Sequence, residues 1–431
     1  MSIFAKRRHE VMQLMGDGVA IIPTAGESLR NGDVHFPFRA ASDFYYLTHF
    51  PEPEAVAVLI PGREHGEFIL FCRERDPEKE IWDGRRAGLE GACEQYGADD
   101  AFPFSDIDEI LPGLLENRDK VFYCMGANPG FDNRLMTWVN EVRSKARTGI
   151  SAPVEILDLG HILHEMRLVK HSVEKALTRK ACKVSAKAHV RAMQECRPGM
   201  NEYEIESIFL HEFRRAGSES AAYPSIVAGG ENACILHYTE NNAELHDGDL
   251  LLIDAGCEMD GYAADISRTF PVNGTFSGEQ RALYEVVLNA QQAAIDCLKP
   301  GVSWNAPHDA AVRVLTEGLV EHGLLKGAVD DLIEEGKYRR FYMHRTGHWL
   351  GMDVHDVGDY KVDSKWRELE SGMILTVEPG LYVSAGEEDI DERWWNIGIR
   401  IEDDVAITSR GCDVLSSDAP KQADDIEQVM R

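Results

Sequence analysis

The sequence has no apolar run long enough to cross a membrane, and it has few positive charges for its size. Its 431 residues include 45 Lys and Arg against 74 Asp and Glu, which gives a formal net charge of −29. A membrane span needs roughly 20 consecutive apolar residues. So negative a chain also repels phosphate backbones and anionic lipid surfaces. We therefore expect no nucleic-acid partner and no membrane partner.

Paired cysteines are also missing. The nine cysteines are scattered along the chain, and no two of them form a C-x-x-C pair. An odd, scattered set favours free thiols over disulfides or a zinc knuckle. The apolar stretch 18–22 is ended by Pro23 and is too short for the core of a signal peptide. We therefore expect a cytoplasmic protein.

Apolar residues make up 44% of the chain, which is enough for a large core and excludes a disordered or fibrous protein. The length favours two domains over one. The first part alternates short apolar runs with helical patterns, which indicates an α/β domain over residues 1–168. Its expected strands are 19–22, 55–60, 67–72 and 120–124, and its expected helix is 132–146.

The second part, residues 169–431, is expected to be α+β with antiparallel hairpins. A helical pattern covers 172–196 and stops before Pro198. Asn201 with Glu204, and Ser277 with Gln280, have the spacing of capping boxes, so each pair predicts the start of a further helix.

Two aspartates flank a predicted hairpin turn in this second part. Asp260 and Gly261 are typical of a two-residue turn between strands. Folding the chain there places Asp254 nearly opposite Asp265, within one residue pair. Like charges so close destabilise a sheet, which favours a bound cation between them. The alternative is that one or both aspartates point to solvent.

A second segment repeats this spacing. Asp254 and Glu378 each follow a glycine by six residues and precede another by two. Asp265 and Glu402 each follow a glycine by four. Chance could produce this match. Two spacings that agree in the same order nevertheless favour an internal duplication, in which two hairpins bring four carboxylates together. Two divalent ions would neutralise their charge of −4, and oxygen ligands suit Mn²⁺, Mg²⁺ or Ca²⁺.

Three histidines, His344, His348 and His355, lie within twelve residues. The glycines between them argue against a helix, and no H-E-x-x-H motif is present, so a helical zinc site is not expected. One imidazole among the carboxylates would favour Mn²⁺, Co²⁺, Fe²⁺ or Zn²⁺. His237 is a fourth candidate. Arg400 comes two residues before Glu402, so in a strand both side chains would face the same side of the sheet. Arg400 could therefore hold a carboxylate in place, or it could form an ordinary surface salt bridge.

These residues resemble a known family. The set Asp254, Asp265, His348, Glu378 and Glu402 is similar to the dinuclear metal site of the pita-bread-fold metallopeptidases, and within that family most similar to aminopeptidase P. The stretches that carry the resemblance are 231–241, 253–258, 348–358, 376–382 and 398–404. The resemblance implies an α+β fold class, with a C-terminal pita-bread (creatinase/aminopeptidase) domain behind an N-terminal α/β creatinase-like domain.

The resemblance also implies a role for each residue of the set. Asp254 would bind one divalent ion, Asp265 and Glu402 would bridge two, and His348 and Glu378 would complete the second. The expected metal is Mn²⁺, with Co²⁺ or Zn²⁺ as alternatives. Glu378, His344 and His355 are implied in catalysis. The implied substrate-binding residues are His237, His344, His355, Tyr382 and Arg400.

The implied enzyme is a metalloaminopeptidase, a hydrolase that releases the N-terminal residue from peptides with proline in second position. A hydroxide bridging the two metals would attack the scissile carbonyl. A prolidase, which cuts Xaa-Pro dipeptides, is the alternative, and a non-catalytic pita-bread binding module is the less favoured one. Met343 is typical of aminopeptidase P, whereas Arg345 stands where the family has glycine, which bears on the substrate length accepted.

The domain of residues 1–168 is expected to gate the substrate and to support a homo-oligomer, a dimer or a tetramer. Within it, Trp82 is expected either to reach a neighbouring active site, as the resemblance suggests, or to pack in the interior.

Overall fold

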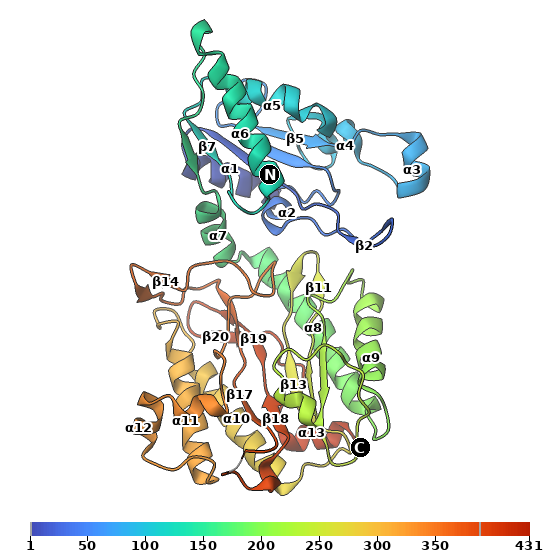
Figure 1. The fold of residues 1–431 in the computed structure, drawn as a ribbon, viewed down its shortest axis with the longest axis vertical. Coiled ribbons are helices and arrows are strands. Elements are labelled where there is room, and N and C mark those ends of the chain that lie inside the picture. Colours follow the sequence, from blue (N-terminus) through green and yellow to red (C-terminus); the bar gives the residue numbers. More distant parts are fainter. Residues whose placement is uncertain (1, 388) are drawn as a thin grey trace. The chain divides into compact units, whose positions relative to one another are not determined.

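The computed structural model describes residues 2–387 and 389–431. The chain divides into two compact units, one that ends at His164 and one of Glu165–Arg431 (Figure 1). This division lies four residues before the boundary expected from the sequence. Among the described helices, none is both long and apolar enough to cross a membrane.

The first unit contains a mixed six-stranded sheet in the order β6-β5-β4-β1-β7-β8. Its strands are β1 (Val19–Pro23), β4 (Val56–Leu59), β5 (Phe68–Cys72), β6 (Asp100–Pro103), β7 (Lys120–Phe122) and β8 (Glu155–Leu157). A small hairpin is formed by β2 (Leu29–Asn31) and β3 (Val34–His35). The four strands predicted from apolar runs are all confirmed, because those runs are buried in the sheet.

The helices of this unit are α1 (Ile3–Met15), α2 (Ser42–Thr48), α3 (Pro77–Asp83), α4 (Gly88–Glu94), α5 (Ile107–Leu115) and α6 (Pro129–Ser144). The predicted helix 132–146 corresponds to α6. Its buried residues include Leu135, Trp138 and Val142, which recur every three or four positions and so face the core.

Trp82 lies on α3, and 87% of its surface is exposed. The expectation that it packs in the interior is therefore wrong. The physical reason is that α3 buries no residue, so it has no face against the core.

Paired helices flank the strands of the second unit (Figure 1). Its long helices are α8 (Ser172–Glu195), α9 (Glu202–Arg215), α10 (Gly278–Asp296) and α11 (Ala306–Glu321), and its short ones are α12 (Val329–Glu334) and α13 (Ala423–Val429). Helix α7 (Gly160–Leu168) precedes α8 along the chain. Both predicted capping boxes are confirmed, at Asn201 and at Ser277, so polar side chains satisfy the first N–H groups of α9 and α10.

The first β-ribbon of this unit carries two of the predicted acids. Strand β10 (Leu250–Asp254) pairs with β9 (Ile226–Gly229) on one side and with β13 (Ser267–Pro271) on the other, and β11 (Glu258–Met259) pairs with β12 (Tyr262–Ala263) beyond them. Asp260 and Gly261 form the tip, with φ of 51° and 81°. Both values lie in the left-handed region that this kind of turn requires.

The register of this ribbon corrects one expectation. Asp254 pairs with Ser267, not with Asp265 or its immediate neighbour. Asp265 comes two residues before Ser267, in the short segment between β12 and β13, so the two aspartates are diagonal neighbours across the ribbon and not directly opposite each other. The reason is that the two-residue turn sets the pairing of the whole ladder.

The second β-ribbon carries the other two acids. Strand β16 (Ile374–Val377) pairs with β19 (Asp403–Ile407), and β17 (Gly380–Val383) pairs with β18 (Ile397–Arg400). Val377 is opposite Asp403 and Gly380 is opposite Arg400. Glu378 and Glu402 therefore lie at the same level between the two ladders. Strand β20 (Cys412–Val414) pairs antiparallel with the other side of β19. A separate hairpin consists of β14 (Lys361–Val362) and β15 (Lys365–Trp366).

We predict that Gly256→Ala destabilises the protein by about 3 kcal/mol or more, since overpacking against a rigid group has costs of this order. A Cβ at this position would lie 1.7 Å from the carbonyl oxygen of Ala264, across the first ribbon. Gly278→Ala is the matched control, because a Cβ there meets no atom within 4 Å and Ala favours a helix. The midpoint of urea unfolding measures both, and equal midpoints would contradict the prediction.

Candidate metal centre and substrate pocket

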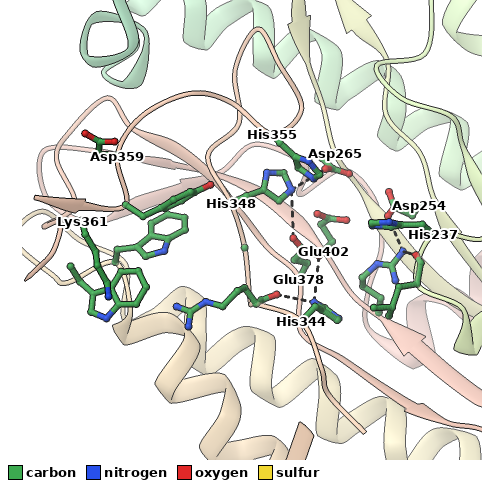
Figure 2. A pocket seen from close by; sticks show the side chains of 17 residues that line it. His237, Asp254, Asp265, His344, His348, His355, Asp359, Lys361, Glu378 and Glu402 are labelled. Carbon is green, nitrogen blue, oxygen red and sulfur yellow. Dashed lines mark hydrogen bonds and ion pairs between the residues drawn. The ribbon is translucent and has the colours of Figure 1, made fainter. Parts of the chain in front are cut away.

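The two ribbons open into a cavity of about 850 Å³ (Figure 2). Its inner part is lined by the acids of both ribbons and by the histidines of the segment 344–355. Six further lining residues form what we call its mouth: Trp304, Arg345, Asp359, Tyr360, Lys361 and Trp366. Of these, Arg345, Asp359 and Lys361 are exposed. The cavity thus joins a group of titratable side chains to an aromatic and charged mouth.

Four carboxylates meet in the inner part, as the duplicated spacing predicts. Asp254, Asp265, Glu378 and Glu402 all line the cavity. Asp265 is only 5% exposed and Glu402 only 1%. These two and His348 each offer one ligand atom, and the three atoms lie within 4.8 Å of one another. Residues from two ribbons and a loop are therefore close enough to share a cation.

The imidazole of His348 is oriented for metal binding. Its Nδ1 lies 2.9 Å from the carbonyl oxygen of Trp349, which can only accept, so Nδ1 carries a hydrogen. Its Nε2 lies 3.4 Å from Oδ2 of Asp265 and 3.5 Å from Oε1 of Glu378. In the neutral ring Nε2 therefore presents a lone pair to the carboxylates, which is how metal-binding histidines are usually held.

A tyrosine that the sequence did not suggest joins the two aspartates of the first ribbon. The hydroxyl oxygen of Tyr223 lies 2.6 Å from Oδ1 of Asp254 and 2.5 Å from Oδ1 of Asp265. Burial and the neighbouring carboxylates raise the pKa of Tyr223 well above its usual value, so the hydroxyl keeps its proton. One hydroxyl thus holds both aspartates in a fixed relation.

Arg400 links the two ribbons. Its Nη2 donates to Oδ2 of Asp254 at 2.8 Å, and its Nε donates to the hydroxyl of Ser267 at 3.0 Å. Ser267 in turn donates to Oε2 of Glu402 at 2.6 Å. Thr376 supports Glu378 as Ser267 supports Glu402. Its hydroxyl donates to Oε1 of Glu378 at 3.2 Å and accepts from the backbone N–H of His348.

The pKa values show how crowded the acids are. Burial, followed by the charge of Asp265, raises the pKa of Asp254 to about 6. Burial and the same charge raise the pKa of Glu378 to about 7, although the charge of His348 opposes them. For Glu402, burial and the other three carboxylates raise the pKa well above its usual range.

His348 and Asp265, in contrast, form an ionised pair. Burial alone would lower the pKa of His348, but the hydrogen bond that its ring donates to Asp265 and the charge of Glu378 raise this pKa to about 9. The same hydrogen bond lowers the pKa of Asp265 despite its burial. His348 and Arg400 thus compensate the four acids only in part. Four hard oxygen ligands and one imidazole fit two divalent cations, because those would supply the missing positive charge.

The other predicted histidines differ in their surroundings. Nδ1 of His344 donates to the carbonyl oxygen of Arg345 at 2.8 Å, and Nε2 lies 2.9 Å from the hydroxyl of Tyr382. Burial and the charge of Arg400 lower the pKa of His344 to about 3, so the ring is neutral. His355 and His237 line the cavity with no hydrogen-bond partner among the residues that the structure describes.

Tyr382 lies behind the cavity wall. It is buried, and its hydroxyl also accepts a hydrogen bond from Nη1 of Arg400 at 3.0 Å. Tyr382 thus holds His344 and Arg400 in place, whereas Arg400 itself lines the cavity.

The chain is similar to known proteins over nearly its whole length. Residues 176–409 match "Metallopeptidase family M24", and residues 4–123 match "Aminopeptidase P, N-terminal domain". The chain is 46% identical to Xaa-Pro aminopeptidase of Escherichia coli strain K12, over 99% of this chain and 97% of that protein.

Two solved structures have the same fold. Aminopeptidase PepP of Pseudomonas aeruginosa has a TM-score of 0.98 and 58% identity, and the match covers 99% of this chain and 97% of that one. Zinc-substituted aminopeptidase P of E. coli in complex with product has a TM-score of 0.97 and 45% identity, with 100% and 98% covered.

We predict that Tyr223→Phe weakens binding of Mn²⁺ by roughly tenfold to a hundredfold, the usual effect of removing a hydrogen bond to a metal ligand. Tyr284→Phe is the control, because its hydroxyl donates to the carbonyl oxygen of Lys421, outside the cavity. Calorimetric titration of metal-free protein measures the affinity. An unchanged affinity in Tyr223→Phe would show that the hydroxyl does not position the aspartates.

We predict that Mn²⁺ stabilises the protein more at about pH 8 than at about pH 5.5. In the metal-free state the raised pKa values of Asp254 (3.8 to about 6) and Glu378 (4.5 to about 7) mean that the folded protein holds protons more tightly than the unfolded chain. Stability is therefore lost as the pH rises through these values. The raised pKa of His348 acts in the same direction, up to about pH 9.

Bound cations would replace those protons, so the gain in Tm on adding Mn²⁺ should grow over the same interval. Scanning calorimetry with and without the ion measures it. An equal gain at both pH values would contradict the assignment of these carboxylates as ligands.

Proposed function

The chain belongs to metallopeptidase family M24, and from this premise we propose that it releases the N-terminal residue of peptides whose second residue is proline. It is a metalloaminopeptidase and hence a hydrolase. The observation that carries the proposal is the complete donor set in one cavity: Asp254, Asp265, His348, Glu378 and Glu402. Similarity to Xaa-Pro aminopeptidases over the whole chain supports the substrate class.

The proposed cofactor is a pair of divalent cations, with Mn²⁺ as the proposed metal. Asp254 would hold one ion, His348 and Glu378 the other, and Asp265 and Glu402 would lie between them. When bound, such ions supply a water of lowered pKa and a Lewis acid for the scissile carbonyl. The central position of Asp265 and Glu402, the two most buried acids of the set, supports the bridging assignment.

Glu378 is proposed to move the proton that the reaction requires. The nitrogen of a prolyl peptide bond carries no hydrogen, so it must gain a proton before it leaves. The buried Glu378 has a pKa raised to about 7, which suits a group that accepts and returns a proton near neutral pH. The Thr376 hydroxyl on its Oε1 leaves Oε2 directed toward His344, 3.9 Å from Nδ1.

The histidines are proposed to contact the substrate. His355 and His237 are exposed to the cavity and can donate to a substrate carbonyl, whose oxygen gains negative charge in the transition state. His344 is held by Tyr382 through one nitrogen and by the Arg345 carbonyl through the other. In the neutral ring Nε2 of His344 therefore accepts from the hydroxyl of Tyr382, and a donor role for Nε2 would need that nitrogen to gain a hydrogen and the hydroxyl of Tyr382 to turn away.

We also propose that the domain of residues 1–168 gates the substrate and supports a homo-oligomer, a dimer or a tetramer. Ile81 and Trp82 of α3 are 81% and 87% exposed, which is unusual for large apolar side chains. A contact with a second copy of the chain would cover them.

The two rival functions make different demands. A prolidase would cut Xaa-Pro dipeptides and leave longer peptides intact, and the named relatives do not favour it. A binding module would not need the full donor set, and all five donors are present in the cavity.

We predict that metal-stripped protein is inactive on Ala-Pro-Ala and regains activity with Mn²⁺. Glu402→Gln should lower kcat/KM by roughly 10²–10³-fold or more, since it removes a charged group from the reacting centre. Glu321→Gln, which removes an exposed carboxylate from α11, is the control.

Mass analysis of the products completes this test. Release of alanine from the tripeptide is expected from an aminopeptidase. Cleavage of Ala-Pro alone would instead support the prolidase. Activity that survives in Glu402→Gln, or that never returns with metal, would contradict the proposed function.

A further inference from the structure

The mouth of the cavity holds two cations on one indole ring. Nζ of Lys361 lies 4.3 Å from the ring centroid of Trp366, and the guanidinium carbon of Arg345 lies 5.1 Å from it. Lys361 and Trp366 are also paired residues of the β14–β15 hairpin. Cation–π attraction therefore holds both charged groups at the same ring, and strand pairing also fixes Lys361 beside it.

Neither cation has an acidic partner. Among the residues that the structure describes, no carboxylate lies within 4.0 Å of Arg345 or Lys361, although the chain has 74 acids for 45 bases. Nη2 of Arg345 donates to Oδ1 of Asn305 at 2.5 Å, which fixes the guanidinium and leaves its other N–H groups free for a ligand. Asp359 also lines the mouth, but it forms no ion pair with either cation.

The position of these cations along the cavity matters for the reaction. In Figure 2, Asp254 and His237 lie at one end of the labelled side chains, and Asp359 and Lys361 lie at the other. Asp265, Glu378 and Glu402 lie between these ends. Arg345 follows His344 directly in the chain. A peptide whose amino group faces Asp254 would therefore extend its carboxyl end toward Arg345 and Lys361.

We propose that Arg345 and Lys361, held over Trp366, form a subsite that binds a carboxylate on the leaving part of the substrate. The inference rests on the proposed function and adds to it a substrate class, short peptides with a free C-terminal carboxylate. A guanidinium recognises a carboxylate through paired N–H donors, and the ammonium adds a second charge. Arg345 is also the residue at which the sequence departs from the expected family pattern.

The test compares three peptides with the Mn²⁺-loaded protein: Ala-Pro-Ala, its C-terminal amide, and Ala-Pro-Asp with an amidated C-terminus. The free acid should have a KM about fivefold to tenfold lower than the amide, with a similar kcat, because the carboxylate is remote from the reacting bond. The difference should shrink at high salt, since the mouth is exposed. The third peptide shows whether a side-chain carboxylate is accepted as well as the chain terminus.

Arg345→Gln and Lys361→Gln should each reduce the preference for the free acid, chiefly by raising its KM. The second variant changes an exposed side chain, so it keeps the test valid if the first fails to fold. Lys365→Gln is the matched control: it removes a positive charge from the same hairpin, but Lys365 does not line the cavity. Its preference should equal that of the unchanged protein.

The possible results separate the claims. Equal KM values for acid and amide, a preference that survives both substitutions, or an equal loss in Lys365→Gln would each overturn the subsite while leaving the proposed function intact. Cleavage of none of the three peptides would contradict the proposed function, and the subsite with it.

Discussion

Repulsion among four carboxylates in one partly enclosed space is the constraint on which the rest of the second unit depends. Asp254, Asp265, Glu378 and Glu402 come from two β-ribbons, and burial together with mutual repulsion raises the pKa of three of them. Such a group persists only if the surrounding structure holds it firmly and a counter-charge is supplied. The proposed divalent cations are that counter-charge.

The fold opposes this repulsion with a second layer of buried polar contacts. Arg268 of β13 in the first ribbon forms an ion pair with Asp403 of β19 in the second at 2.8 Å, and both side chains are fully buried. Nζ of Lys421 forms a second ion pair with Asp403, 2.6 Å from its Oδ2. Arg268 also donates to the carbonyl oxygen of Glu402. Removing one partner of such a buried network leaves an unpaired charge, so these residues keep the ribbon rigid where the ligands project.

Much of this architecture follows from local sequence signals. The turn at Asp260, the capping boxes at Asn201 and Ser277, and the repeated spacing between glycines and acids each depend on a few neighbouring residues, and each predicts the structure correctly. The four acids among the proposed ligands were found in the same way, because the two ribbons repeat one pattern, whereas His348 was singled out from the other histidines by the family resemblance.

Other features could not be read locally. Tyr223 lies 31 residues before Asp254, and no spacing signals that its hydroxyl would join two aspartates. The pairing of Asp254 with Ser267 depends on how the turn sets the register, and the sequence estimate was two positions off. The aromatic and cationic mouth combines Arg345 with a hairpin that begins sixteen residues later, so only the folded chain shows that Lys361 and Trp366 share its site.

The most direct test of the central claim is to locate metal in crystals of the Mn²⁺-loaded protein by anomalous scattering at the manganese edge. The account predicts two peaks per chain, both enclosed by the side chains of Asp254, Asp265, His348, Glu378 and Glu402. Peaks elsewhere, or none among these five residues, would contradict it.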